Sequence, residues 1–314
     1  MDVLLEARNL TKNFGSKTAV DGISLSVSKG EILGFLGPNG AGKTTTMKML
    51  TGFLAPTSGE AFVCGEPVTK GGVMARRHIG YLPEGAPLYG EMTPRSFLHF
   101  IAEARDIAPE DVRDVVESAA GAVHLTSVME QRIDTLSKGY RRRVGIASAI
   151  LHAPEVLILD EPTDGLDPNQ KHEMRRLIEA MSVDRAIIIS THILEEVEAI
   201  CHRAVIINKG TIVADGTPSE LKARSQYKNA VTLLLSSEAA EKAASALKQI
   251  KAIERVEAAD EGDNMRLTIL AKGRGEIADI ISDIASVSNW GVSQFSVDTG
   301  RLDDVFRQLT EGEV

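Results

Sequence analysis

The residues best suited to bind an anion form one glycine-rich run that ends in lysine and threonine: Gly37, Pro38, Asn39, Gly40, Ala41, Gly42, Lys43, Thr44 and Thr45. Glycines let the backbone turn its N–H groups toward phosphate oxygens, and a helix that begins here adds its positive end. Lys43 could neutralise β- and γ-phosphates, and the Thr44 hydroxyl could ligate Mg²⁺. The run therefore predicts binding of a nucleoside triphosphate with Mg²⁺, a property that kinases, GTPases and motor ATPases share.

Two neighbouring carboxylates and one histidine each follow a short apolar run. Asp160 and Glu161 come after Val156–Leu159, and His192 comes shortly after Ala186–Ser190. Asp160 could hold the water shell of Mg²⁺, and Glu161 could act as general base on the attacking water. His192 could reach the γ-phosphate if both runs are strands of one sheet. The pattern predicts hydrolysis, although two acidic residues that begin a surface loop would look the same.

The elements that must position these residues alternate between apolar runs and helical patterns over residues 1–224. This alternation predicts an α/β domain whose parallel strands lie buried between helices. Parallel strands bring their carboxyl ends to one edge of a sheet, so the glycine run, the carboxylates and His192 should meet there. The clearest strands are expected at Ile32–Leu36, Val156–Leu159, Ala186–Ser190 and Ala204–Asn208.

One stretch, from about Arg95 to Leu136, is instead mostly helical in its pattern. It predicts a helical subdomain inserted at about residues 88–140, because its apolar residues recur at helical spacing. One apolar face is expected from Phe97, Phe100, Ile101 and Ala104.

A second domain is expected at residues 225–314, after a polar linker. Its pattern reads strand, helix, strand, strand, helix, strand, which is the order of a small α+β ferredoxin-like fold. A short helix should follow. The expected elements are Ala230–Ser236, Glu238–Lys251, Ile253–Ala258, Met265–Leu270, Glu276–Val287, Gly291–Val297 and Leu302–Leu309.

The composition excludes several classes of protein. The 314 residues are 43% hydrophobic and carry a net charge of −9, which disfavours nucleic acid as a partner. No apolar stretch approaches the ~20 residues that span a bilayer, and the amino terminus lacks a signal peptide. We therefore expect a cytoplasmic chain. Cys64 and Cys201 have no paired spacing, which indicates buried reduced thiols rather than a disulfide or a zinc framework.

A short segment between the glycine run and the acidic pair points to a family. Leu136, Ser137, Lys138, Gly139 and Tyr140 resemble the signature segment of the ABC (ATP-binding cassette) ATPases, whose consensus is Leu-Ser-Gly-Gly-Gln. Lys138 and Tyr140 depart from that consensus. The resemblance implies a P-loop ABC ATPase core with a mixed sheet. It also implies that Ser137 and Gly139 begin a helix that caps the γ-phosphate of ATP held by an opposite subunit.

Other positions match the same family in their order along the chain. The resemblance places Phe14 where an aromatic ring stacks on adenine, and Asp167 at the contact between subunits. It makes His192 the switch histidine. Glu84 stands where most members carry a glutamine, so it adds negative charge there. The expected catalytic residues are Glu161, His192 and Lys43, and the expected Mg²⁺ ligands are Thr44, Glu84 and Asp160.

The resemblance also implies the partners. Two copies would sandwich ATP and pass their motion to a multi-span membrane permease, which docks on the helical subdomain and the segment Tyr81–Tyr89. The chain would thus lie on the inner face of the cell membrane. Pro87–Tyr89 and the ending Leu302–Phe306 resemble a gliding-motility or ABC-2-type exporter subgroup. An extracytoplasmic accessory subunit, and a sensing or dimer-stabilising role for the second domain, stay open. The alternative is a soluble ABC ATPase acting on nucleic acid or ribosomes, against which the acidic balance and the single cassette argue.

Overall fold

A computed structural model describes residues 2–68 and 72–311, which divide into two units between Thr217 and Pro218. The boundary expected at residues 224 and 225 lies further along the chain. The observed boundary precedes the expected one because the short helix α8 (Pro218–Lys222) contacts α11 (Leu302–Glu311) and so belongs to the second unit. Residues 312–314 of the expected second domain lie outside the described residues.

The first unit contains a central sheet of strand order β10-β9-β3-β8-β7-β6. Its strands from β9 to β6 are parallel, and β10 joins β9 in antiparallel fashion. β3, β7 and β8 are buried along their whole length, as continuous apolar runs in parallel sheets require. The four strands expected from the sequence are confirmed. The bounds are β3 Ile32–Leu36, β6 Ile79–Leu82, β7 Val156–Asp160, β8 Ala186–Thr191, β9 Arg203–Asn208 and β10 Thr211–Gly216.

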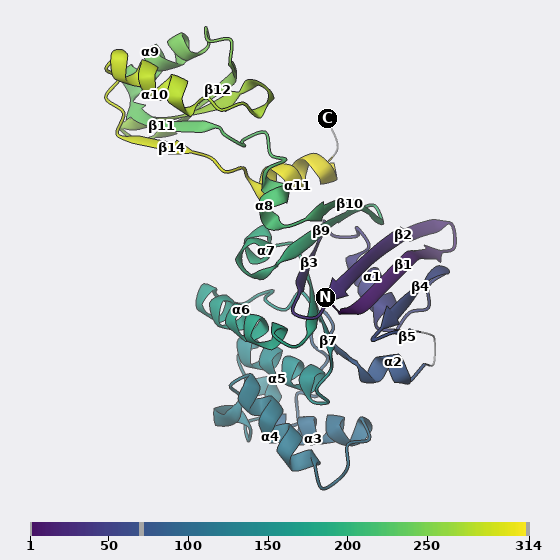
Figure 1. Cartoon of the computed structure of the whole chain (residues 1–314). Helices are drawn as coiled ribbons and strands as arrows, with labels where there is room; N and C mark the ends of the chain where they lie inside the picture. The colour runs from purple at the N-terminus through teal and green to yellow at the C-terminus, as the bar shows by residue number, and fades with distance from the viewer. Residues whose placement is uncertain (1, 69–71, 312–314) are drawn as a thin grey trace. The chain divides into compact units, whose positions relative to one another are not determined.

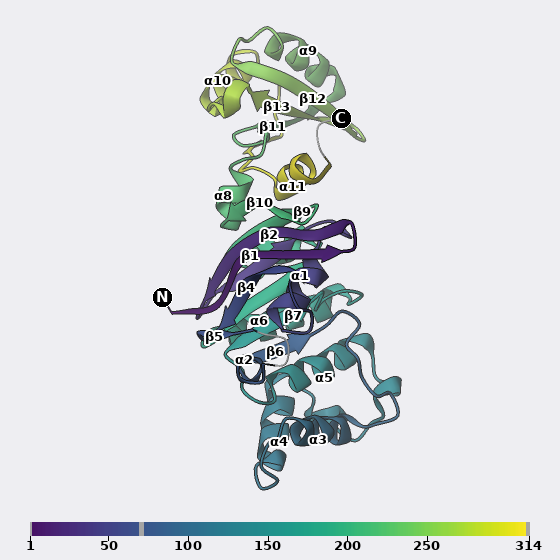
Figure 2. The same ribbon diagram turned by 90° about the vertical axis from the view of Figure 1, so that its right-hand side faces the viewer.

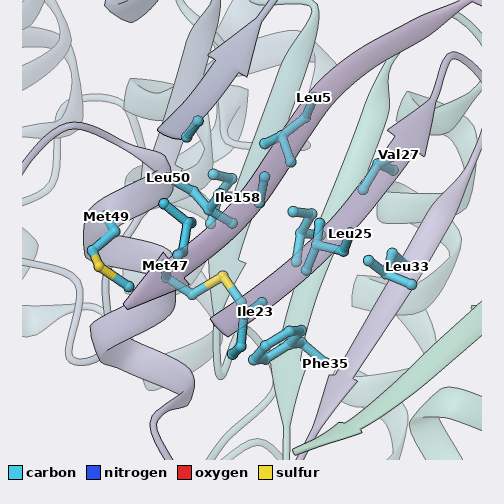
Figure 3. Close-up of a cluster of buried hydrophobic side chains, with 14 of the residues drawn as sticks. Leu5, Ile23, Leu25, Val27, Leu33, Phe35, Met47, Met49, Leu50 and Ile158 are labelled. Carbon is cyan, nitrogen blue, oxygen red and sulfur yellow. The ribbon is translucent and has the colours of Figure 1, made fainter. Parts of the chain in front are cut away.

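A second sheet in this unit is antiparallel and has strand order β2-β1-β4-β5. The helix α1 (Lys43–Leu50) contacts strands of both sheets. Figure 3 shows the shared core, in which Ile23 of the second sheet lies near Phe35 of the central sheet and Met47 of α1. This packing gives the start of α1 a rigid support. The bounds are β1 Val3–Phe14, β2 Lys17–Ser28, β4 Ser58–Val63 and β5 Glu66–Pro67.

The remaining helices of the first unit include the expected helical subdomain. Figures 1 and 2 both show α3 and α4 grouped at one end of the unit, away from β1 and β2. Among the described residues, no helix is both long and apolar enough to cross a membrane. The bounds are α2 Met74–Arg77, α3 Pro94–Ala104, α4 Val112–Ala122, α5 Lys138–Ile150, α6 Pro168–Ser182 and α7 Leu194–Ile200, with 3₁₀ turns at Thr126–Val128 and Ile133–Thr135.

The apolar face expected on α3 is partly wrong. Phe97 is buried, but Phe100 is 43% exposed and Ala104 is also exposed. Leu98 and Ala102 are buried instead. The buried face is therefore turned by about one residue, because α3 packs on both α4 and α5 and not on a single neighbour.

The second unit has the order β11, α9, β12, β13, α10, β14, which is the order expected from the sequence. Its antiparallel sheet has the strand order β12-β13-β11-β14, as a ferredoxin-like fold requires. Its buried core includes Trp290 and is formed only by residues of this unit. The bounds are β11 Val231–Ser236, α9 Ser237–Leu247, β12 Ile253–Glu261, β13 Asn264–Ala271, α10 Ala278–Val287 and β14 Gln294–Val297, with a 3₁₀ turn at Lys272–Arg274.

Candidate active site

The glycine-rich run forms a tight loop between β3 and α1. Gly42 precedes α1 with a φ of 112°, a backbone conformation that residues with a Cβ rarely adopt. A Cβ at Gly42 would lie 2.6 Å from the carbonyl oxygen of Ala19, and one at Gly37 would lie 2.6 Å from the Ile207 side chain. Both positions therefore require glycine, so that the loop can pack against the ends of neighbouring strands.

Lys43 is the first residue of α1 and is only 7% exposed. Its Nζ donates hydrogen bonds to the carbonyl oxygens of Gly37, at 2.7 Å, and Pro38, at 3.3 Å. Burial lowers the pKa of Lys43, and the nearby carboxylates of Glu161, Asp160 and Glu84 partly oppose that shift. The ammonium group is thus held by the loop itself, where phosphate oxygens could replace the two carbonyls.

Asp160 ends β7 and is fully buried. Because β7 and β8 are parallel, it lies opposite Ser190, whose hydroxyl donates a hydrogen bond to Oδ1 of Asp160. Among the described residues, the other oxygen, Oδ2, is buried without a hydrogen-bond partner. A buried carboxylate oxygen left in this way fits the coordination shell of a hard cation such as Mg²⁺.

Glu161 follows directly and adopts a left-handed backbone, with a φ of 51°. Its N–H donates a hydrogen bond to the carbonyl of Ser190, at 3.0 Å. The Oε2 atom lies 2.9 Å from Nδ1 of His192, whose side chain is half exposed. A strained backbone of this kind costs about 1–3 kcal/mol and is common at functional sites. The strands therefore bring Glu161 and His192 into contact at the carboxyl edge of the sheet.

Lys43 and Glu161 line one hollow of about 680 Å³, while Asp160 and His192 lie outside its described lining. Phe14 contributes a ring that is 52% exposed, with Nζ of Lys12 5.4 Å from its centre. Glu84 lies at the same hollow and is exposed. The complete lining is Phe14, Lys17, Thr18, Ala19, Asn39, Gly40, Gly42, Lys43, Thr44, Thr45, Glu84, Glu161 and Lys209.

The sequence pattern does not predict four of the residues that line this hollow: Lys17, Thr18, Ala19 and Lys209. Lys209 follows β9, so its place at the carboxyl edge of the sheet could have been inferred. The other three follow Phe14 across the β1–β2 hairpin, which periodicity in the central sheet does not indicate.

Ser137 and Gly139 lie at a different hollow, of about 880 Å³, which shares no described lining residue with the first. Ser137 caps α5, and its hydroxyl accepts a hydrogen bond from the N–H of Tyr140. Gly139 lies against Gln170 of α6, where a Cβ would come within 2.9 Å of the amide oxygen. Asp167 is exposed and caps α6. Within one chain, the signature residues are thus not brought to the nucleotide hollow.

Comparisons with known proteins find similar chains and similar structures. A family model described as ABC transporter matches residues 20–164. The chain is 39% identical over 216 residues to the uncharacterized ABC transporter ATP-binding protein YhcH of Bacillus subtilis (strain 168), covering 68% of this chain and 70% of that protein. It is also 39% identical to the Nod factor export ATP-binding protein I of Paraburkholderia xenovorans (strain LB400), covering 70% and 73%. Among solved structures, cbiO1 from Clostridium perfringens, part of the ABC transporter complex cbiONQ, has a TM-score of 0.65 and 29% identity, with coverage of 71% and 92%.

Proposed function

The chain belongs to the ABC transporter family, and from this membership we propose how its own residues bind ATP, hydrolyse it and pass the motion to a membrane partner. It is an ATP-binding subunit of an ABC transporter, and it hydrolyses ATP. The observation that carries the proposal is the convergence of Lys43, Asp160, Glu161 and His192 at one edge of the central sheet.

ATP would occupy the 680 Å³ hollow. The exposed ring of Phe14 offers a stacking surface for adenine, and the backbone N–H groups at the start of α1 would face the phosphate oxygens. The Nζ group of Lys43 would exchange its bonds with the Gly37 and Pro38 carbonyls for bonds to the β- and γ-phosphates. That exchange costs little, because one set of oxygen acceptors replaces another.

Thr44, Asp160 and Glu84 are the residues that would hold Mg²⁺. The unpartnered Oδ2 atom of Asp160 supports this assignment, and Thr44 and Glu84 line the hollow. When bound, Mg²⁺ supplies charge neutralisation for the transferred phosphoryl group.

Glu161 would accept a proton from the water that attacks the γ-phosphorus, while the bond from that phosphorus to the oxygen of ADP breaks. His192 would orient the carboxylate through the 2.9 Å contact between Nδ1 and Oε2. His192 is half exposed, so its other ring nitrogen stays available to the γ-phosphate.

A second copy of the chain would complete each site. Ser137 and Gly139 line a hollow separate from the ATP hollow, so a single chain does not bring its signature to its own nucleotide. We infer a dimer in which each signature caps the ATP of the other copy, with the exposed Asp167 near the contact. ATP then joins the copies, and hydrolysis lets them separate.

The permease would dock on an exposed apolar patch of the helical subdomain. Tyr89 is 59% exposed and packs edge-on against Phe100, and with Leu88 and Met92 they line a hollow of about 590 Å³. A short amphipathic helix from a membrane protein fits such a surface. We propose that this docking would hold the chain at the inner face of the cell membrane. We infer export as the direction, from the exporter named among the relatives and from the segment Leu302–Phe306, which resembles that of an exporter subgroup.

The variant Glu161→Gln tests the proposed base. It should still bind ATP, but it should form a persistent ATP-bound dimer and lose turnover by about 100-fold or more, since amides do not accept the proton. Dimerisation is measured by light scattering and turnover by phosphate release. The control is Glu195→Gln, which changes an exposed carboxylate on α7 and should leave both unchanged. Normal turnover by the Glu161 variant would reject the assigned base.

A further inference from the structure

Three side chains of metal-binding type meet at the edge of the central sheet opposite the ATP hollow. Cys64 lies in the turn between β4 and β5, His78 precedes β6, and Glu155 precedes β7. β6 and β7 are parallel, and Ile79 pairs with Val156, so His78 and Glu155 are neighbours at the start of these strands. Spacing along the chain did not indicate this cluster, because its members come from three separate segments.

The distances suit a shared ion. Sγ of Cys64, a ring nitrogen of His78 and a carboxylate oxygen of Glu155 all lie within 4.8 Å of one another. Nδ1 of His78 is 3.0 Å from Oε2 of Glu155. In a tetrahedral zinc site the ligand atoms lie about 3.3–3.8 Å apart, given zinc–ligand bonds of about 2.0–2.3 Å. The more distant ligand atoms would therefore have to approach by up to about 1 Å, and Nδ1 of His78 and Oε2 of Glu155 would have to move apart slightly.

The backbone at these positions is already fixed. Cys64 has a φ of 51°, which costs a residue with a Cβ about 1–2 kcal/mol, and its N–H is tied to the carbonyl of Leu4 at 2.8 Å. The carbonyl of His78 accepts a hydrogen bond from the N–H of Val156 at 3.0 Å. Ion binding would therefore require rotation of side chains and little movement of the backbone, which reduces its entropic cost.

We propose that Cys64, His78 and Glu155 bind a zinc-type divalent ion, with water as the remaining ligand. A thiolate and an imidazole favour Zn²⁺ over Mg²⁺, because Mg²⁺ takes oxygen ligands in octahedral geometry. The five residues of β7 separate Glu155 from the catalytic carboxylates by about 16 Å, at about 3.3 Å per residue. The site is thus distinct from the one that serves hydrolysis.

Cobalt titration of the full-length chain tests the proposal, because Co²⁺ replaces Zn²⁺ and gives an absorption band when it is bound to sulfur. The wild-type chain should bind one Co²⁺ with a sulfur-to-cobalt charge-transfer band, which Zn²⁺ then removes. Cys64→Ser should abolish the band. His78→Gln should weaken binding by more than the ~10–100-fold typical of losing an outer hydrogen-bond partner.

The matched control is Cys201→Ser, which removes the other, buried cysteine of the chain. It should retain the band, and thermal unfolding establishes that each variant is folded. A folded wild-type chain that shows no such band contradicts the proposal, and so does an equal loss in the two cysteine variants. Either outcome would leave His78 and Glu155 as an ion pair beside a free thiol. ATP turnover does not enter the test, so failure of the assigned base would not affect it.

Discussion

Gly42 and Gly40 lie two residues apart in the phosphate loop, but a methyl group would meet different surroundings at the two positions. At Gly42 it would lie 2.6 Å from the Ala19 carbonyl oxygen, whereas at Gly40 nothing lies within 4 Å. Both residues have positive φ values, of 112° and 80°. Gly42→Ala should therefore suffer the steric overlap as well as the backbone strain, and should lose ATP binding.

The companion variant Gly40→Ala separates the two causes. It carries backbone strain of about 1–3 kcal/mol but no overlap, so its ATP affinity should fall much less. Affinity is measured with a fluorescent ATP analogue, and folding by circular dichroism. Equal losses in the two variants would show that backbone strain, and not the contact with Ala19, makes glycine necessary at residue 42.

Single residues could be placed from the sequence where they directly follow an apolar strand. Asp160, Glu161 and His192 were found in this way, because the carboxyl ends of parallel strands share an edge. The cluster of Cys64, His78 and Glu155 could not be found, since the turn that carries Cys64 belongs to the antiparallel sheet. Nothing in a local pattern indicates how two sheets lie against each other.

At the scale of elements, a hydrogen bond of His152, which follows α5, links this helix to the first residue of β6. Its Nε2 atom lies 3.0 Å from the carbonyl oxygen of Ile79. Burial, together with the positive charge of Arg105, lowers the pKa of His152 to about 4 from 6.5. The imidazole is therefore neutral in the folded chain at neutral pH, and it can donate its Nε2 hydrogen to Ile79.

The lowered pKa of His152 predicts a loss of stability in acid. Between pH 6.5 and about 4 the unfolded chain binds a proton that the folded chain rejects, so the free energy of unfolding falls as pH falls. The free energy of unfolding of His152→Gln should fall less as the pH is lowered. At pH 5 its loss should be smaller than that of the wild type by about 1 kcal/mol, after allowance for solvent screening. Thermal unfolding from pH 7.5 to 5 measures the difference. His172→Gln, on the exposed face of α6, should follow the wild type, and a wild-type slope in the His152 variant would contradict the assigned role.

The sequence predicts whether a segment is a strand or a helix more readily than it predicts which face of that element is buried. The strands β3, β7, β8 and β9 were predicted because continuous apolar runs suit strands buried on both faces. The buried face of α3 was misplaced by about one residue, since helical spacing does not specify which neighbours a helix contacts. Phe100 of α3 is exposed instead, and with Tyr89 it forms the patch to which we assign the permease.

At the scale of the whole molecule, the chain has two units with separate cores. The core of the first lies between its two sheets and α1, and that of the second lies between its own sheet, α9 and α10. In the proposed site ATP would contact the hollow whose described lining residues all belong to the first unit. Saturating ATP should therefore raise the unfolding temperature of the first unit alone, because a ligand stabilises only the structure that binds it.

A substitution at Asp304 should lower the unfolding temperature of the second unit. It is 3% exposed, and its carboxylate accepts hydrogen bonds from the Ser225 hydroxyl at 2.7 Å and from the Gln226 N–H at 3.0 Å. Side-chain amides of Gln226 and Gln308 add two more. Burial acts to raise the pKa of Asp304, but these hydrogen bonds outweigh it and lower the pKa. The carboxylate thus fixes the segment that enters the second unit onto α11.

Asp304→Ala should destabilise the second unit by about 2–3 kcal/mol, because several donors lose a charged acceptor together. Calorimetry of the Asp304→Ala chain, with and without ATP, should show two unfolding transitions. The substitution should lower the unfolding temperature of the second unit, which ATP should not change. ATP should raise the unfolding temperature of the first unit, which the substitution should not change. The matched control, Asp303→Ala, removes an exposed carboxylate paired with Arg307 and should change neither by more than about 0.5 kcal/mol. If the Asp304 substitution instead lowers the transition that ATP raises, the units fold as one cooperative structure, and the second unit then contributes to the stability of the ATPase itself.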